Sequence, residues 1–188
     1  MILTASAITE NIKSGNIVIS PFNEEQLNPN SYDLRLLNKL LVYEMIYNDD
    51  RPPAINASFF RYFLDSKKEN PYSEIIIPEE GYVLIPNCLY LGSTVEYTET
   101  HNFVPMIEGK SSIGRLGIDI HKTAGFGDLS FCGMWTLEIT VVQPIKIYPN
   151  MKIAQIFYTT VQGEITKTYN GKYQNQNDII ASKAYRDF

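Results

Sequence analysis

Residues 134–160 read MWTLEITVVQPIKIYPNMKIAQIFYTT, and this stretch indicates the class of fold. It contains three short apolar segments, at 134–142, 145–148 and 153–160, which Pro144 and Pro149 separate. Short segments rich in β-branched and aromatic residues between turn residues are typical of β-strands, because such side chains pack well on a pleated surface. We therefore expect three strands here.

The same pattern continues along the rest of the chain. Seven further strands are expected, at 16–20, 32–43, 74–77, 82–86, 89–97, 104–108 and 118–121. The sequence shows no alternation of strands with long helices, which a parallel sheet would require. The pattern predicts a mainly β fold of the sandwich, jelly-roll or barrel type.

Helical signals are confined to two short stretches. Thr4 can cap a helix in which Ala7, Ile8 and Ile12 share one side, and Gly15 follows its end. A second short helix is expected at 111–116.

The composition is that of an ordinary globular protein. The chain has 188 residues, 44% of them hydrophobic and 20% charged, and a net charge of −5, so we expect a single domain over 1–188. The negative charge argues against broad nucleic-acid binding, which requires a basic face. No apolar run is long enough to span a membrane, and the first residues lack the features of a signal peptide, so we expect no membrane partner and a cytoplasmic protein.

Cysteine and histidine are scarce. The chain holds only Cys88, Cys132, His101 and His121. Two cysteines make no disulfide framework, and this ligand set makes a zinc site hard to assemble. Free thiols and the absence of zinc are the expectations.

Two segments have a composition that is unfavourable for forming a hydrophobic core. Residues 48–70 are rich in charge and proline but include Phe59, Phe60, Tyr62 and Phe63, so we expect an insertion that packs an aromatic face on the body. Residues 169–188 are polar and rich in Asn and Gln, which predicts a tail without a core of its own.

The stretch EGKSSIGRLG, at 108–117, is the densest functional signal. Lys110 and Arg115 flank Ser111 and Ser112, so a short helix here would direct two cations, two hydroxyls and free N–H groups at an anion such as phosphate. The spacing excludes a P-loop, because Val104 stands where that motif needs glycine. The alternative is that this stretch binds no ligand: the two serines would cap the helix, and the two cations would be solvated.

Two further signals follow. In TAGFGDLSFCG, at 123–133, glycines accompany Asp128 on an expected tight loop that can offer main-chain groups to a planar ligand; the alternative is a plain turn residue. Glu138 lies in an apolar strand, where alternation places it with Thr136 and Thr140, opposite the apolar residues. Such a carboxylate is either solvent-facing, paired, or held for acid–base chemistry.

These motifs together resemble a known family. The stretches NSYDLRL (30–36), EGKSSIGRLG (108–117), HKTAG (121–125), TLEI (136–139) and GKYQNQ (171–176) occur in the order found in the dCTP deaminase branch of the trimeric dUTPase superfamily. The resemblance covers nearly the whole chain. It implies a homotrimer of distorted β-barrel or jelly-roll subunits, the dUTPase-like β-clip, with sites at the subunit interfaces.

The resemblance also implies roles for residues of the site. Glu138 would be the general base and acid, and Ser111 and Arg115 would hold the attacking water. Asp128 is retained, although its loop, GDLS at 127–130, departs from the usual family pattern. The remaining candidates would bind the cytosine edge or the phosphates: Lys122, Thr123, Ala124 and Gly125 for the base, and Lys110, Ser111, Ser112, Arg115, Tyr169, Lys172 and Gln176 for the phosphates.

The resemblance implies dCTP as substrate, dTTP or dUTP as an inhibitor or product ligand, and Mg²⁺ bound through the triphosphate without protein ligands. Hydrolytic deamination of dCTP to dUTP and ammonia is the main expectation, with Glu138 activating water in place of zinc. The alternative is a bifunctional enzyme that forms dUMP and pyrophosphate, which Lys110, Gly114 and the pair Ala124-Gly125 favour. A plain dUTP triphosphatase, a silent nucleotide-binding module and a capsid-like or lectin-like jelly roll are the other readings. The tail at 169–188 is expected to be a mobile lid over the nucleotide.

Overall fold

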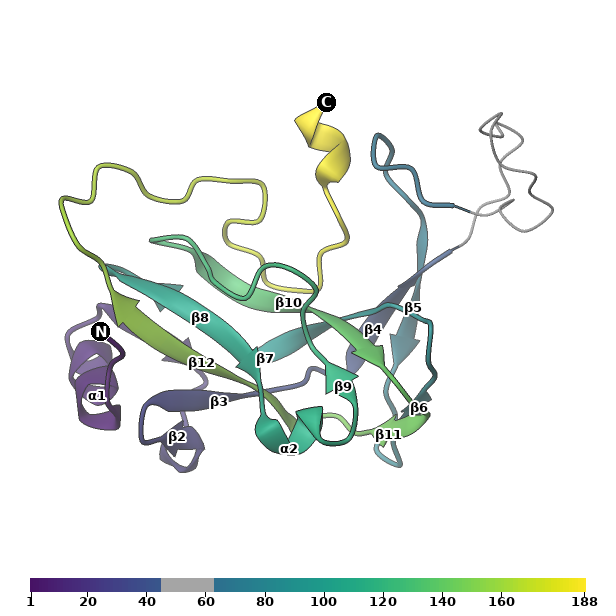
Figure 1. Ribbon diagram of the computed structural model, residues 1–188, viewed down its shortest axis with the longest axis horizontal. Coiled ribbons are helices and arrows are strands. Elements are labelled where there is room, and N and C mark those ends of the chain that lie inside the picture. Colours follow the sequence, from purple (N-terminus) through teal and green to yellow (C-terminus); the bar gives the residue numbers. More distant parts are fainter. Residues whose placement is uncertain (45–62) are drawn as a thin grey trace.

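The largest sheet of this computed structural model, which describes residues 1–44 and 63–188, runs in the order β5-β4-β7-β10-β9, with β1 also paired to β7 (Figure 1). All pairings in this sheet are antiparallel. Its strands are β1 Ile17–Ser20, β4 Lys39–Tyr43, β5 Tyr72–Ile76, β7 Tyr90–Thr100, β9 Ile118–Asp119 and β10 Cys132–Val141.

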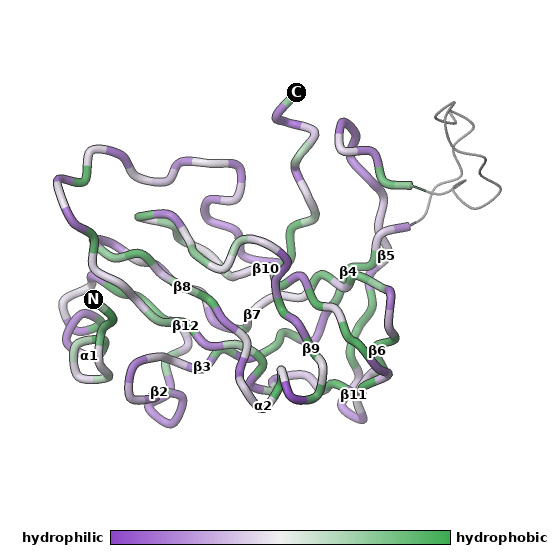
Figure 2. Tube along the Cα trace, in the orientation of Figure 1, coloured by the Kyte–Doolittle hydropathy of each residue, from purple (hydrophilic) through white to green (hydrophobic). Residues whose placement is uncertain are grey.

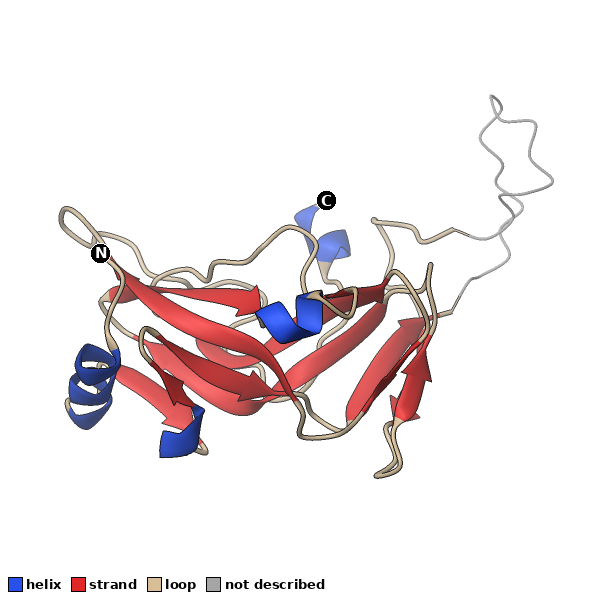
Figure 3. Cartoon of the chain, turned by 60° about the horizontal axis from the view of Figure 1, so that its bottom comes forward, coloured by secondary structure: helices blue, strands red, loops and turns tan. Residues whose placement is uncertain are grey.

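Two smaller sheets complete the fold. One has the order β2-β3-β12-β8 and the other pairs β11 with β6. Their strands are β2 Leu27–Asn28, β3 Ser31–Arg35, β6 Tyr82–Leu84, β8 Phe103–Gly109, β11 Ile145–Ile147 and β12 Lys152–Thr160. In Figures 1 and 3 the strands form a curved wall, and the short helices lie at its margins. This curled half-barrel confirms the mainly β expectation.

The core is built from side chains of all three sheets and of helix α1. Apolar residues recur along the strands (Figure 2), because every second side chain of a strand points to the same face. The side chains of Tyr32, Leu36, Ile139, Ile156 and Tyr158 are fully buried.

The first helix forms as its residues indicate. Helix α1 spans Ala5–Lys13, and the side chain of Thr4 accepts a hydrogen bond from the Ala7 N–H group at 3.5 Å. Ile8 is fully buried. Gly15 follows the helix with φ of +78°, a conformation in which glycine is favoured.

The second expected helix is shorter than 111–116. Helix α2 spans Ser111–Gly114, and Arg115 is its C-cap. Two short 3₁₀ helices were not expected: η1 Glu24–Gln26 and η2 Ala184–Asp187.

The expectation of one strand over 32–43 is wrong. The chain forms β3 and β4, which belong to different sheets. At the crossing, the Leu36 N–H group donates to the Met151 carbonyl at 2.9 Å, and the Leu37 N–H group donates to the Ser93 carbonyl at 2.8 Å. Leu36 is fully buried at this corner, whereas Asn38, directly before β4, is exposed and marks the interruption.

Two expectations concern other parts of the chain. Most of the segment at 48–70, including Phe59, Phe60 and Tyr62, lies outside the described residues. In the two stretches that the structure describes, no helix has both the length and the apolar character of a membrane span.

Candidate functional site

Glu138 lies on the outer face of β10. Leu137, Ile139 and Val141 are buried, whereas Glu138 and Thr140 are partly exposed, as the alternation predicts. A shift in register between Met134 and Thr136 lies two residues before Glu138. The strand therefore anchors itself in the core with one face and presents a carboxylate with the other.

The backbone of the preceding loop holds the Glu138 carboxylate. Its Oε2 atom accepts a hydrogen bond from the Lys122 N–H group at 2.7 Å, and the Glu138 N–H group donates to the Ile120 carbonyl at 2.8 Å. The Lys122 ammonium group bonds to the Thr140 hydroxyl. Within the described residues, Oε1 accepts no hydrogen bond, so the geometry leaves this oxygen to bind a water or a ligand.

The loop that holds Glu138 runs on beside β8. The Ile107 N–H group donates to the Gly125 carbonyl at 2.6 Å, and the Gly127 N–H group donates to the Pro105 carbonyl at 2.8 Å. A Cβ atom at Gly127 would lie 2.4 Å from the Trp135 ring, so only glycine fits there without a shift.

The expected base-reading residues lie in this loop. Lys122, Thr123 and Ala124 are exposed and Gly125 is partly exposed. The His121 Nε2 atom lies 3.3 Å from the Glu108 carboxylate on β8. Of these four candidates, Lys122 contacts Glu138 through its N–H group, and Thr123, Ala124 and Gly125 follow it in the same loop.

Helix α2 presents its polar residues to solvent. Ser111, Ser112 and Arg115 are exposed, while Ile113 is buried and anchors the turn. Lys110, just before the helix, is only partly exposed, because its ammonium group is paired with Asp33.

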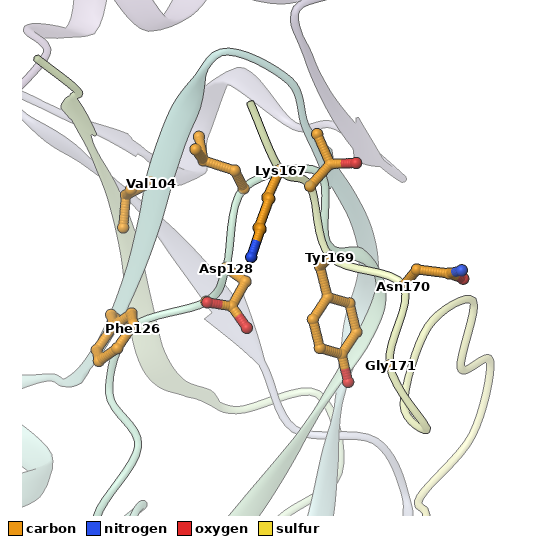
Figure 4. A pocket seen from close by; sticks show the side chains of 10 residues that line it. Val104, Phe126, Asp128, Lys167, Tyr169, Asn170 and Gly171 are labelled. Atoms are coloured by element: carbon orange, nitrogen blue, oxygen red, sulfur yellow. The ribbon is translucent and has the colours of Figure 1, made fainter. Parts of the chain in front are cut away.

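Asp128 and Tyr169 share a cavity of about 390 Å³ (Figure 4). The Tyr169 N–H group donates to the Leu129 carbonyl at 2.7 Å, and the Tyr169 ring lies 5.8 Å from that of Phe131. Two candidates that are 41 positions apart in the sequence therefore line one cavity. The lining residues are Val104, Phe126, Gly127, Asp128, Leu129, Lys167, Thr168, Tyr169, Asn170 and Gly171.

A family model described as dCTP deaminase-like matches residues 2–161. The chain belongs to the dCTP deaminase-like family. It is 51% identical to a protein of Cytophaga hutchinsonii and 52% identical to one of Clostridium acetobutylicum, in both cases over 100% of this chain and 99% of the relative. Both relatives are named "dCTP deaminase, dUMP-forming".

A solved structure supports the fold of this family. The 2'-deoxycytidine 5'-triphosphate deaminase of Agrobacterium tumefaciens matches with a TM-score of 0.60 and 21% sequence identity. The match covers 85% of this chain and 48% of the other, so this chain spans about half the length of that protein.

The names of the relatives correct one expectation. The main expectation, that dCTP is converted to dUTP and ammonia, is contradicted, because the relatives that match over the whole chain are named dUMP-forming. Lys110, Gly114 and the pair Ala124-Gly125 already favoured the dUMP-forming alternative, but they were given too little weight against the main expectation. The alternative reading, with dUMP as product, fits better.

The tail of this dCTP deaminase-like chain packs on its own body. The Met134 N–H group donates to the Gln176 carbonyl at 2.8 Å, and the Gln176 side chain bonds to the Met134 carbonyl. The Lys172 ammonium group lies 2.5 Å from Asp187. Gln176 and Ile179 are buried, so the tail does contribute to a core; whether it is a lid stays a prediction.

One chain does not unite all the phosphate-binding candidates. Helix α2 lies at the lower edge of the molecule in Figure 1, whereas the chain after β12 runs over the upper side, and Gln176 pairs with Gly133 and Met134 on β10. Lys110, Ser111, Ser112 and Arg115 are therefore separated from Tyr169, Lys172 and Gln176.

Two residues of this region were missed from the sequence. They are Asp33 and Lys152: the Lys110 ammonium group bonds to one oxygen of Asp33, and the Lys152 ammonium group lies 3.3 Å from the other oxygen of Asp33. The signal for Asp33 was present, because a carboxylate in the buried strand SYDLR needs a partner. Nothing in the sequence pointed to Lys152.

Proposed function

We propose that this protein is a dUMP-forming dCTP deaminase. The overall reaction consumes two waters and converts dCTP to dUMP, ammonia and pyrophosphate. The observation that carries the proposal is the Glu138 carboxylate, held at 2.7 Å by the Lys122 N–H group beside an exposed loop backbone. The choice of dUMP as product rests on the names of relatives that are 50–52% identical over the whole chain.

Deamination is the step that Glu138 serves. Its carboxylate takes a proton from water as the oxygen attacks C4 of cytosine, and returns a proton to the departing amine. The C–N bond breaks and a C–O bond forms, so the step is a hydrolysis. Lys122, Thr123, Ala124 and Gly125 would hold the cytosine edge through main-chain groups. Ser111 and Arg115 would hold the water and stabilise the charge that develops.

The sugar and the phosphates need the other candidates. We assign the cavity of Asp128 and Tyr169 to the nucleoside, since a carboxylate can accept a hydrogen bond from a sugar hydroxyl and an aromatic ring can pack on the sugar. The phosphates would meet Lys110, Ser111, Ser112, Arg115, Lys172 and Gln176.

A homotrimer with sites between subunits is part of the proposal. The exposed polar residues of α2 lie far from the tail of the same chain (Figure 1), so a neighbouring subunit can complete the phosphate site. dTTP or dUTP would bind the same pocket as an inhibitor or product ligand. An enzyme of the deoxynucleotide pool is proposed to work in the cytoplasm.

Magnesium is proposed to enter with the nucleotide. In the ranges 1–44 and 63–188, no group of three His, Cys, Asp or Glu side chains is arranged to hold a metal. Phosphate oxygens and waters are the ligands that Mg²⁺ prefers, and the ion would neutralise charge on the triphosphate. The proposal assigns no zinc to the reaction.

The proposal is tested by product analysis. The purified protein is incubated with dCTP and Mg²⁺, and ammonia, dUTP, dUMP and pyrophosphate are separated and quantified over time. We expect ammonia, dUMP and pyrophosphate in equal amounts from the first turnovers. Accumulation of dUTP without pyrophosphate, or release of pyrophosphate without ammonia, would contradict it.

A further inference from the structure

A buried carboxylate lies directly behind the phosphate-binding candidates. The side chain of Asp33, on β3, is only 4% exposed. Its Oδ1 atom pairs with the Lys110 ammonium group and accepts a hydrogen bond from the Asn28 amide at 2.9 Å. Its Oδ2 atom lies 3.3 Å from the Lys152 ammonium group. One carboxylate thus holds two lysines, one on each oxygen.

The two lysines lie together next to α2. The Lys110 N–H group donates to the carbonyl of Ile153, the residue that follows Lys152, at 3.5 Å. The side chains of Lys110 and Lys152 are 21% and 44% exposed, so both ammonium groups remain within reach of a ligand. Lys152 also donates to the Glu25 carbonyl at 3.2 Å.

The charges in this cluster do not cancel. Two ammonium groups share one carboxylate, so these three groups together carry a formal excess of one positive charge. A single cation would be enough to balance a buried carboxylate, so the second is unexplained by stability alone. Burial works to raise the pKa of Asp33, but hydrogen bonds from Lys110 and Asn28 outweigh it and hold this pKa below its ordinary value.

The neighbouring carboxylate Glu96 shows the contrast. It is fully buried on β7, and its Oε1 atom lies 2.7 Å from Arg35 Nε. Its Oε2 atom accepts a hydrogen bond from the backbone N–H group of Arg35 at 2.8 Å. The side-chain amide of Gln26 also donates to Oε1 at 3.0 Å. Arg35 and Glu96 thus form a pair of one cation and one anion, so the buried charge of Glu96 is balanced and no net charge remains on the pair.

We propose that Asp33 is a positioning residue that holds Lys110 and Lys152 beside α2, and that Lys152 is a further phosphate-binding residue of the site. A lysine side chain is flexible, and a buried partner fixes its ammonium group in place. The triphosphate would then meet two oriented cations in addition to Ser111, Ser112 and Arg115. This inference rests on the proposed function, because it places the triphosphate at α2.

The kinetic test compares Asp33→Asn and Lys152→Met with Glu96→Gln, a matched loss of a buried carboxylate. Asp33→Asn and Lys152→Met are each expected to raise the KM for dCTP about tenfold, the loss of one charge-assisted contact, with kcat changed less. Glu96→Gln is expected to lower Tm and leave KM unchanged. The inference is overturned if Asp33→Asn or Lys152→Met leaves KM unchanged, or if Glu96→Gln raises it equally.

A binding test separates this inference from the proposed function. Inorganic tripolyphosphate is titrated into the full-length protein, and Tm is followed. We expect it to raise the Tm of the wild type and of Glu96→Gln, and to raise that of Lys152→Met much less. Equal shifts in all proteins, or none in the wild type, overturn the inference whatever the reaction proves to be. Lys152→Met keeps both tests decisive even if Asp33→Asn fails to fold, because the Lys152 side chain is 44% exposed and Asp33 keeps Lys110 and Asn28 as partners.

Discussion

Three carboxylates on strands differ in their surroundings, and those surroundings suggest different roles. Glu96 is fully buried and paired with Arg35, so it serves the stability of the fold. Asp33 is buried between two lysines. Glu138 is partly exposed, and its hydrogen bond comes from a backbone N–H group rather than from a cation. Among the residues that the structure describes, no cationic side chain forms a salt bridge with Glu138, and its Oε2 atom is held by the Lys122 N–H group instead.

Glu138→Gln is expected to abolish deamination while dCTP still binds. The amide keeps the shape of the side chain but cannot accept the proton of the attacking water, and such a group contributes about 10²–10⁴-fold. Single-turnover rates and equilibrium binding of dCTP measure the two effects. Glu74→Gln, an exposed carboxylate on β5, is the control. A Glu138→Gln enzyme with more than about a tenth of the normal rate contradicts the role.

Asp33 is expected to make the protein sensitive to acid. Because its pKa is lower in the folded state, its carboxylate stabilises the fold fully above the unfolded-state pKa of about 3.9. That contribution is lost as the pH falls below this value and through the folded-state pKa. Urea unfolding from pH 7 to pH 3 should show the stability difference between wild type and Asp33→Asn shrinking below about pH 4. A constant difference would be inconsistent with the lowered pKa.

The tail is held to the body through β4. Ile179 is buried with Leu41 and Leu91, and Asp178 pairs with Lys39. The Ser182 N–H group donates to the Tyr43 hydroxyl at 2.7 Å. Burial raises the pKa of Tyr43, so this hydroxyl stays neutral as the acceptor.

The same segment also crosses β10 near the candidate site. The Ile180 N–H group donates to the Thr136 hydroxyl at 3.2 Å, two residues from Glu138 on the same face of the strand. Any opening of this part of the tail would therefore change the surroundings of Glu138.

Deleting residues 172–188 is expected to raise the KM for dCTP and lower kcat, because Lys172 and Gln176 are lost. It also uncovers Leu41 and Leu91, so Tm falls. Ile179→Ala is the control, since it costs about 2–5 kcal/mol of packing but keeps both candidate ligands. Lid closure is tested by limited proteolysis of Glu138→Gln, which binds dCTP without consuming it. Equal cleavage of the tail with and without dCTP would exclude a lid.

At the scale of the whole molecule, the candidate phosphate-binding residues of α2 and those of the tail do not form one site within a single chain. The α2 residues and the tail lie at opposite edges in Figure 1, and α2 projects Ser111, Ser112 and Arg115 into solvent. A neighbouring copy can bring these edges together, and closed rings of identical subunits repeat such a junction at every interface.

Mixing Glu138→Gln and Arg115→Ala subunits is expected to restore activity that neither protein has alone. If each site takes these two residues from different chains, random mixing leaves about one interface in four intact. The assay follows dUMP formation after subunit exchange, and exchange itself is checked with a labelled chain. Sedimentation should show three copies of a 21.5-kDa chain. Exchange without activity would mean that both residues come from one subunit.

Local features of the structure follow from neighbouring residues and could be predicted. The outward position of Glu138 follows from strand alternation, and the helix after Thr4 follows from its cap. Each depends on backbone preferences within a few residues. The break at Leu36 could not be predicted, because it depends on hydrogen bonds to Met151 and Ser93, which lie far along the chain.

Contacts between distant segments depend on how the sheets pack. Lys110 meets Asp33 across 77 positions and Arg35 meets Glu96 across 61, and in neither case does one partner's sequence specify the other. The tail shows the same limit: its polar composition indicated no core, yet Ile179 is buried because β4 and β7 offer Leu41 and Leu91. Periodicity and caps are properties of a segment, whereas a partner for a buried charge or an apolar side chain exists only once remote strands lie side by side.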